Sequence, residues 1–153
     1  MVPDRNALLV RCREHLAAGH AEYLLELKNL DEAAAGETKS SSGDKYETAR
    51  EMIAQSRNLI ARNLAEAEAR LDDLARMAAA PLRPVIGFGS LVETDGGWYL
   101  IGASLGEWDI SGIVVRMISL ASPLGAALRG KGAGDRIPWR GAALEVIRVP
   151  VPD

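Results

Sequence analysis

The chain has 153 residues, a formal net charge of −3 and a single cysteine. An acidic chain is a poor candidate for binding duplex DNA by neutralising its phosphates, so we expect no sequence-specific DNA binding. One cysteine excludes an intrachain disulfide, and the chain shows neither an apolar run of transmembrane length nor a signal-peptide core, which predicts a cytoplasmic protein with no membrane partner.

Composition divides the chain near residue 80. Residues 1–80 are rich in Ala, Leu, Glu and Arg and hold only three of the 15 glycines. All three tryptophans and the only phenylalanine follow residue 80. The first mixture favours helices and the second favours short strands. We therefore predict an α+β fold with two domains, residues 1–80 and 81–153.

Two helical patterns fill the first domain. Asp4 is the predicted N-cap of a helix that reaches about residue 35, and a second helix ends near residue 79, because Pro81 and Pro84 prevent its continuation. The first apolar seam is Leu9, Cys12, Leu16, Tyr23, Leu27, Leu30 and Ala34. The second is Ala49, Ile53, Ser56, Ile60, Leu64, Ala67, Leu71, Leu74 and Ala78. Such seams, joined by a short polar loop, predict a long antiparallel coiled-coil hairpin.

The tip of this hairpin, near residues 43–48, carries two carboxylates three residues apart, Asp44 and Glu47. D-x-x-E at a helix start is a capping box, in which both acids also complement the helix dipole. The same spacing places both carboxylates on one side of the first turn, where they can share a hard cation such as Mg²⁺. These residues alone leave both interpretations open.

Beyond residue 80 the pattern changes to short strands joined by glycine-rich turns. Strands are predicted over 85–93, 98–103, 113–120, 136–139 and 143–149. Ser122 is the predicted N-cap of a short helix that has Pro123 at its first position and ends before Gly130. We interpret the G-x-G triplets at 87–89 and 130–132 as turn glycines, because neither has the continuation of a phosphate loop. The second domain should be a small, mostly antiparallel sheet with one helix.

Nearly the whole chain resembles the GreA/GreB family of bacterial transcription elongation factors. The tip, residues 43–47, matches the family pattern G-D-x-x-E. Residues 122–135 match the run S-P-L-x-x-x-L-x-G-K-x-x-G-D. Two departures lie beside the tip, since Thr48 and Glu51 stand where the family commonly has Asn and Tyr.

The resemblance implies an FKBP-like fold for the second domain and docking on bacterial RNA polymerase, for which Ser122, Pro123 and Leu124 are the candidate residues. The hairpin would enter the secondary channel of the polymerase. There Asp44 and Glu47 would help hold a catalytic Mg²⁺ and stimulate cleavage of backtracked transcripts. The protein is then an accessory factor rather than an enzyme. It needs no cofactor when free, because Mg²⁺ is shared only in the complex.

The nascent RNA 3′ end would be met indirectly, and Arg50 and Arg57, one heptad apart near the tip, are the candidate RNA contacts. Three other hypotheses stay open. A channel-binding factor could inhibit or modulate polymerase without cleavage. An FKBP-like prolyl isomerase or chaperone would use the aromatic residues of the second domain. A structural coiled-coil adaptor would make no use of the tip acids.

Overall fold

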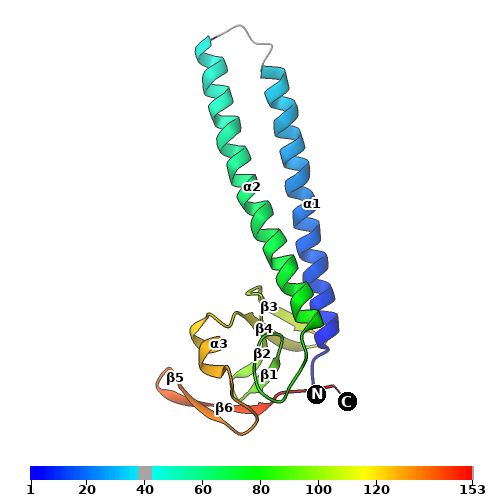
Figure 1. Ribbon diagram of the computed structural model, residues 1–153, viewed down its shortest axis with the longest axis vertical. Helices are drawn as coiled ribbons and strands as arrows, with labels where there is room; N and C mark the ends of the chain where they lie inside the picture. Colours follow the sequence, from blue (N-terminus) through cyan, green and yellow to red (C-terminus); the bar gives the residue numbers. More distant parts are fainter. Residues whose placement is uncertain (38–42, 153) are drawn as a thin grey trace. The chain divides into compact units, whose positions relative to one another are not determined.

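The fold is α+β, as predicted, with two long helices followed by a six-stranded mixed sheet and one short helix (Figure 1). The computed structural model describes residues 1–37 and 43–152, and it describes side chains over 1–36 and 47–152. Residues 38–42, which lie between the two long helices in the sequence, are outside the described residues.

Helix α1 (Arg5–Glu37) begins where the sequence predicts. The carboxylate Oδ1 of Asp4 accepts a hydrogen bond from the backbone N–H of Ala7 at 3.0 Å, which confirms Asp4 as the N-cap. Helix α2 (Gly43–Ala79) ends two residues before Pro81. Proline has no N–H and crowds the preceding turn, so the helix stops there.

The two predicted seams coincide with the less exposed faces of the helices. Every residue of the first seam is buried or half-buried, and in the second only Ser56 and Ala78 are exposed. Two side-chain interactions join the helices and show that they run antiparallel, because the later residue of α1 pairs with the earlier residue of α2. His20 Nε2 lies 3.1 Å from Glu68 Oε1, and Arg57 Nε lies 3.3 Å from Asp31 Oδ1. Coiled-coil packing between the helices stays a prediction.

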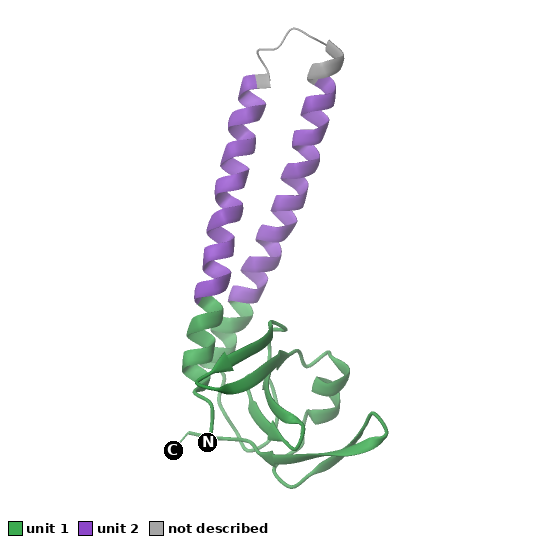
Figure 2. Cartoon of the chain, turned by 180° about the vertical axis from the view of Figure 1, so that it is seen from behind, with its two compact units in different colours: residues 1–13, 72–153 green, residues 14–71 purple. Residues whose placement is uncertain are grey.

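The contacts of the chain divide it into two compact units (Figure 2). One unit contains residues 1–13 and 72–153, and the other contains residues 14–71. The first unit, called the sheet unit below, therefore includes the sheet, the start of α1 and the end of α2. The second unit, residues 14–71, is called the helical unit. Residue 80, where composition changes, lies inside this unit.

The sheet has the strand order β3-β4-β2-β1-β6-β5. Its strands are β1 (Leu91–Thr94), β2 (Gly97–Ile101), β3 (Gly106–Ile110), β4 (Ile113–Ile118), β5 (Arg136–Trp139) and β6 (Ala142–Arg148). β2 and β4 pair in parallel, with Trp98 opposite Val115, whereas the other neighbours are antiparallel. The sheet is mostly antiparallel, as predicted, and the parallel pairing of β2 with β4 is the one exception among the described strands. After β2 the chain forms β3, a strand that the sequence did not predict. It then turns back into β4, which runs parallel to β2.

A tight turn joins β3 to β4 and lets β3 pair with β4 as a hairpin. Ser111 and Gly112 both have positive φ, 52° and 86°, as a tight hairpin turn requires. The carboxylate of Asp109 accepts the N–H of Gly112 at 2.8 Å and stabilises that turn.

The first predicted strand, 85–93, is correct only from Leu91 onward. Before it, Ile86 pairs with the loop after α3 rather than with the sheet: its N–H donates to Lys131 O at 2.8 Å, and its carbonyl accepts the N–H of Gly130 at 2.9 Å. Residues 87–90 then form a turn in which Gly89 has φ of 89°. The glycines at 87 and 89 are turn residues, as predicted.

Helix α3 (Pro123–Leu128) packs on one face of the sheet. Ser122 Oγ accepts the N–H of Gly125 at 3.0 Å and Pro123 opens the helix, which confirms the predicted cap. The buried core on this face is Ile86, Val92, Tyr99, Ile101, Leu124, Leu128, Ile137, Val146 and Val149.

A second set of buried side chains joins the helix ends of the same unit to the sheet. Leu8, Cys12 and Met77 are essentially inaccessible to solvent. The thiol of Cys12 lies 3.3 Å from the sulfur of Met117 in β4, and the sulfur of Met77 accepts the N–H of Ala103 at 3.3 Å. The start of α1 and the end of α2 are thus part of the core of the sheet unit.

Candidate functional site

The candidate acidic tip lies at the start of α2. Gly43 is the first residue of the helix, so positions 44 and 47 lie within its first turn and a half. Positions three apart on a helix face the same side. The side chain of Glu47 is exposed, and that of Asp44 lies outside the described residues. The capping and metal-binding interpretations of this pair both stay predictions.

Two carboxylates fit Mg²⁺ chemically but fill only part of its shell. Mg²⁺ prefers six oxygen ligands in an octahedron and keeps several waters when few protein ligands are present. In the described part of the chain, no group of three or more His, Cys, Asp or Glu side chains could hold a metal ion. Because two carboxylates fill only part of this shell, a magnesium ion at the tip would take further ligands from water or from a partner.

Arg57, one of the two candidate RNA contacts, has an acidic partner. Its Nε lies 3.3 Å from Asp31 Oδ1 of α1, and both side chains are 51% exposed. A solvent-exposed ion pair contributes about 0–1 kcal/mol to stability. Exchanging Asp31 for an RNA phosphate as the partner of Arg57 would therefore lose little free energy. Arg50 is exposed on the same helix, closer to the tip.

The candidate docking residues have unequal access to a partner. Leu124 is 8% exposed and belongs to the core under α3. Ser122 is half-buried, and its hydroxyl donates to Ser119 O at 2.6 Å while it caps the helix. Pro123 is the exposed member of the three.

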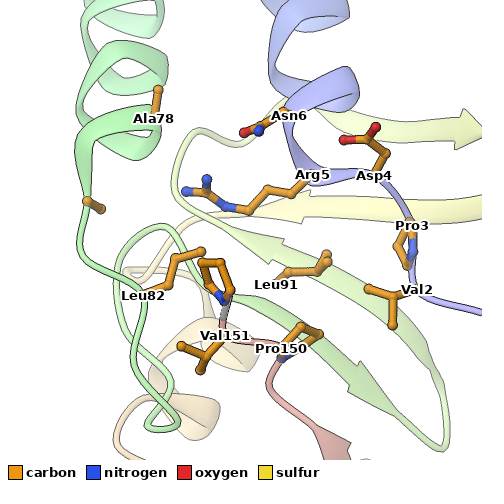
Figure 3. A pocket seen from close by; sticks show the side chains of 12 residues that line it. Val2, Pro3, Asp4, Arg5, Asn6, Ala78, Leu82, Leu91, Pro150 and Val151 are labelled. Atoms are coloured by element: carbon orange, nitrogen blue, oxygen red, sulfur yellow. The ribbon is translucent and has the colours of Figure 1, made fainter.

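Sequence reasoning missed a pocket of about 530 Å³ in the sheet unit, lined by residues from both ends of the chain (Figure 3). Its lining includes Val2, Asp4, Arg5, Leu82, Leu91 and Val151. The guanidinium of Arg5 donates through Nε to Gly89 O at 2.9 Å and through Nη2 to Met77 O. Burial lowers the pKa of Arg5. This side chain ties the start of α1 to the end of α2 and to the turn before β1.

A second hollow, of about 600 Å³, follows residues 80–90. Its lining includes Pro81, Arg83, Val85, Ile86 and Phe88. The guanidinium of Arg76 lies over the ring of Phe88, 5.1 Å from its centre, as in a cation–π contact. The sequence prediction gave no sign of this hollow, because it placed residues 85–93 in a strand of the sheet. The strand begins only at Leu91, and the residues before it line the hollow instead.

Comparison with known proteins gives no family for the chain: no protein-family model matches it, and no curated protein matches it significantly. Over the described ranges 1–37 and 43–152, no helix is both long enough and apolar enough to cross a membrane.

Proposed function

We propose that this protein binds bacterial RNA polymerase, inserts its two long helices into the secondary channel and stimulates cleavage of backtracked transcripts. The observation that carries the proposal is the position of the acid pair on α2. Glu47 lies near the start of α2 and Leu71 is the last residue of α2 in the helical unit, and the helix rises roughly 35 Å between them at 1.5 Å per residue. A protein built in this way can bring two carboxylates to a site that a globular surface does not reach.

The polymerase performs the hydrolysis in this proposal, and the protein is an accessory factor. When bound, Mg²⁺ stabilises negative charge on the attacking and leaving oxygens of a phosphoryl displacement. Asp44 and Glu47 would supply oxygen ligands from one side and accept hydrogen bonds from metal-bound water. The nascent RNA 3′ end would be met only indirectly, with Arg50 and Arg57 as candidate contacts, and the protein would act in the cytoplasm.

The sheet unit would anchor the protein on the polymerase. We assign it to the FKBP-like folds on the resemblance of residues 122–135, and its six-stranded sheet with one short helix supports that assignment. Leu124 and Leu128 pack into the core between α3 and the sheet. A prolyl isomerase needs an open apolar cleft for its substrate, and the pockets of about 530 Å³ and 600 Å³ in this unit keep it as the alternative function.

The test is transcript cleavage in stalled, backtracked elongation complexes, with wild type compared to Asp44→Asn/Glu47→Gln. We expect Mg²⁺-dependent cleavage of the 3′ end by wild type and a loss of at least about 100-fold in the double variant, as for removal of groups that act only in the transition state. Glu22→Gln/Glu26→Gln removes the same charge from exposed positions of α1 and should cleave like wild type.

Three other outcomes would contradict the proposed function or the role of the tip acids in it. Polymerase binding without cleavage by wild type would indicate the channel-occupying regulator and leave the tip acids as helix caps. Turnover of proline peptides would indicate the isomerase. Cleavage that survives in the double variant would refute the role of the tip.

A further inference from the structure

A second surface of the sheet unit combines two segments that are far apart in the sequence. We call residues 81–88 and 129–132 together the linker surface. The two hydrogen bonds of Ile86, to Lys131 and Gly130, hold the segments side by side. They approach so closely that a Cβ on Gly132 would lie 3.3 Å from the carbonyl oxygen of Pro84. Two prolines, Pro81 and Pro84, further restrict the first segment. This surface is preorganised, so a partner would spend little entropy in ordering it.

The linker surface is locally positive in a chain whose net charge is −3. No Asp or Glu occurs from residue 74 to 92 or from residue 110 to 134. The cations on the surface are Arg83, Arg129 and Lys131, and all three are exposed. Two acids border these stretches. Asp73 pairs with Arg76, whereas Asp135 accepts the N–H of Gly132 at 2.8 Å and keeps its negative charge, so three cations face one carboxylate here.

Apolar groups lie among these cations. Val85 is 52% exposed and lines the 600 Å³ hollow, where Pro81 and Phe88 are further apolar neighbours. An aromatic ring that binds a nucleic acid base must offer its face, and Arg76 covers one face of Phe88, which leaves at most the other face for a base. A hollow of this kind with a basic rim is complementary to an acidic protein segment that inserts an apolar side chain.

We infer that the linker surface is a docking site for an acidic, apolar-bearing segment of RNA polymerase. This inference rests on the proposed function. It places a contact at the C-terminal end of α3, whereas the candidates Ser122 and Pro123 lie at its N-terminal end. Contacts at both ends of α3 would fix the orientation of the sheet unit on its partner.

The experiment measures the affinity of the full chain for bacterial core RNA polymerase by biolayer interferometry at several salt concentrations. Arg83→Glu/Lys131→Glu should bind roughly ten-fold more weakly and show a shallower salt dependence, because two attractive charges become repulsive. Val85→Ser should also weaken binding, with an unchanged salt dependence. Arg136→Glu/Arg140→Glu reverses two exposed charges on β5 and its turn and should bind like wild type.

The outcomes separate this inference from the function on which it rests. If wild type binds and the linker variant binds equally well, the inference is wrong and the proposed function stands. If wild type does not bind polymerase, both are wrong. If a single-stranded RNA 20-mer binds wild type and not the linker variant, the surface binds nucleic acid and a protein occupant is refuted. Circular dichroism and thermal unfolding of each variant confirm that the fold is retained.

Discussion

Gly102 should tolerate a single added methyl group poorly, because it lies directly against a buried side chain of α2. A Cβ at this position would lie 2.3 Å from the sulfur of Met77, 2.6 Å from its Cε and 2.7 Å from its Cγ. Since Met77 is 0% exposed, its side chain has no solvent-filled space into which it can swing. Either the end of α2 moves away from the sheet or Met77 leaves its rotamer and gives up the N–H of Ala103.

Overpacking of this kind costs about 1–3 kcal/mol. We therefore expect Gly102→Ala to lower the free energy of unfolding by about 2 kcal/mol and Tm by roughly 4–8 °C. The assay is urea unfolding followed by circular dichroism, with thermal unfolding alongside it. Gly87→Ala is the matched control, because a Cβ at Gly87 meets nothing within 4 Å and this glycine has no positive φ.

A double-mutant cycle tests the physical cause. Met77→Ala alone should destabilise the protein by about 2–5 kcal/mol, because it removes a buried side chain. In the Met77→Ala background the added methyl has room, so Gly102→Ala should cost little there. Equal stability of Gly102→Ala and Gly87→Ala would refute the reasoning, and so would full additivity in the cycle.

Two further predictions concern single side chains of the same unit. Burial raises the pKa of the Cys12 thiol from 9.0 to about 11, so the folded protein keeps this proton where the unfolded chain loses it, and stability should fall as pH rises from 9 towards 11. At pH 8 a thiol reagent should label Cys12 only after unfolding, and immediate labelling of the native protein would contradict its burial. Ser122→Ala removes the cap of α3 and should cost about 1 kcal/mol in urea unfolding, whereas Ser122→Thr keeps a hydroxyl and should cost less. Equal losses in the two Ser122 variants would show that the hydroxyl does not act as a cap.

The helix ends were predictable from the sequence because local chemistry decides them. Asp4 caps α1 through Ala7, three residues away, and Ser122 caps α3 through Gly125, at the same spacing. Pro81 ends α2 from a neighbouring position in the chain. The α+β class followed from composition for a similar reason, since propensities are summed over each half.

The sheet order was not predictable in the same way, because it depends on partners that are distant in sequence. The parallel pairing of β2 with β4 follows from β3, a five-residue strand that is hard to distinguish from a loop by pattern alone. Val85, Ile86 and Phe88 are residue types that favour strands, yet Ile86 bonds to a loop some 45 residues further on.

In the candidate site too, features set by neighbouring residues were predictable and features set by distant contacts were not. Spacing alone identified Asp44 and Glu47 as a pair on one helical turn. No spacing rule indicates that Arg5 donates to Met77 and Gly89, which lie 72 and 84 residues away. The linker surface is likewise a product of tertiary contacts, and only its lack of acidic residues can be read from the sequence.

The assignment of residues 1–13 to the sheet unit has a consequence for synthesis on the ribosome. The first turns of α1 leave the exit tunnel early, yet the sheet residues with which they form a core, such as Met117, come from the second half of the chain. Until that half has emerged, Leu8 and Cys12 lack the partners that bury them, and a nascent chain exposes this apolar surface to chaperones. Completion of the sheet unit must then follow translation of β6, the last strand, so folding of the two chain ends is a late and cooperative event.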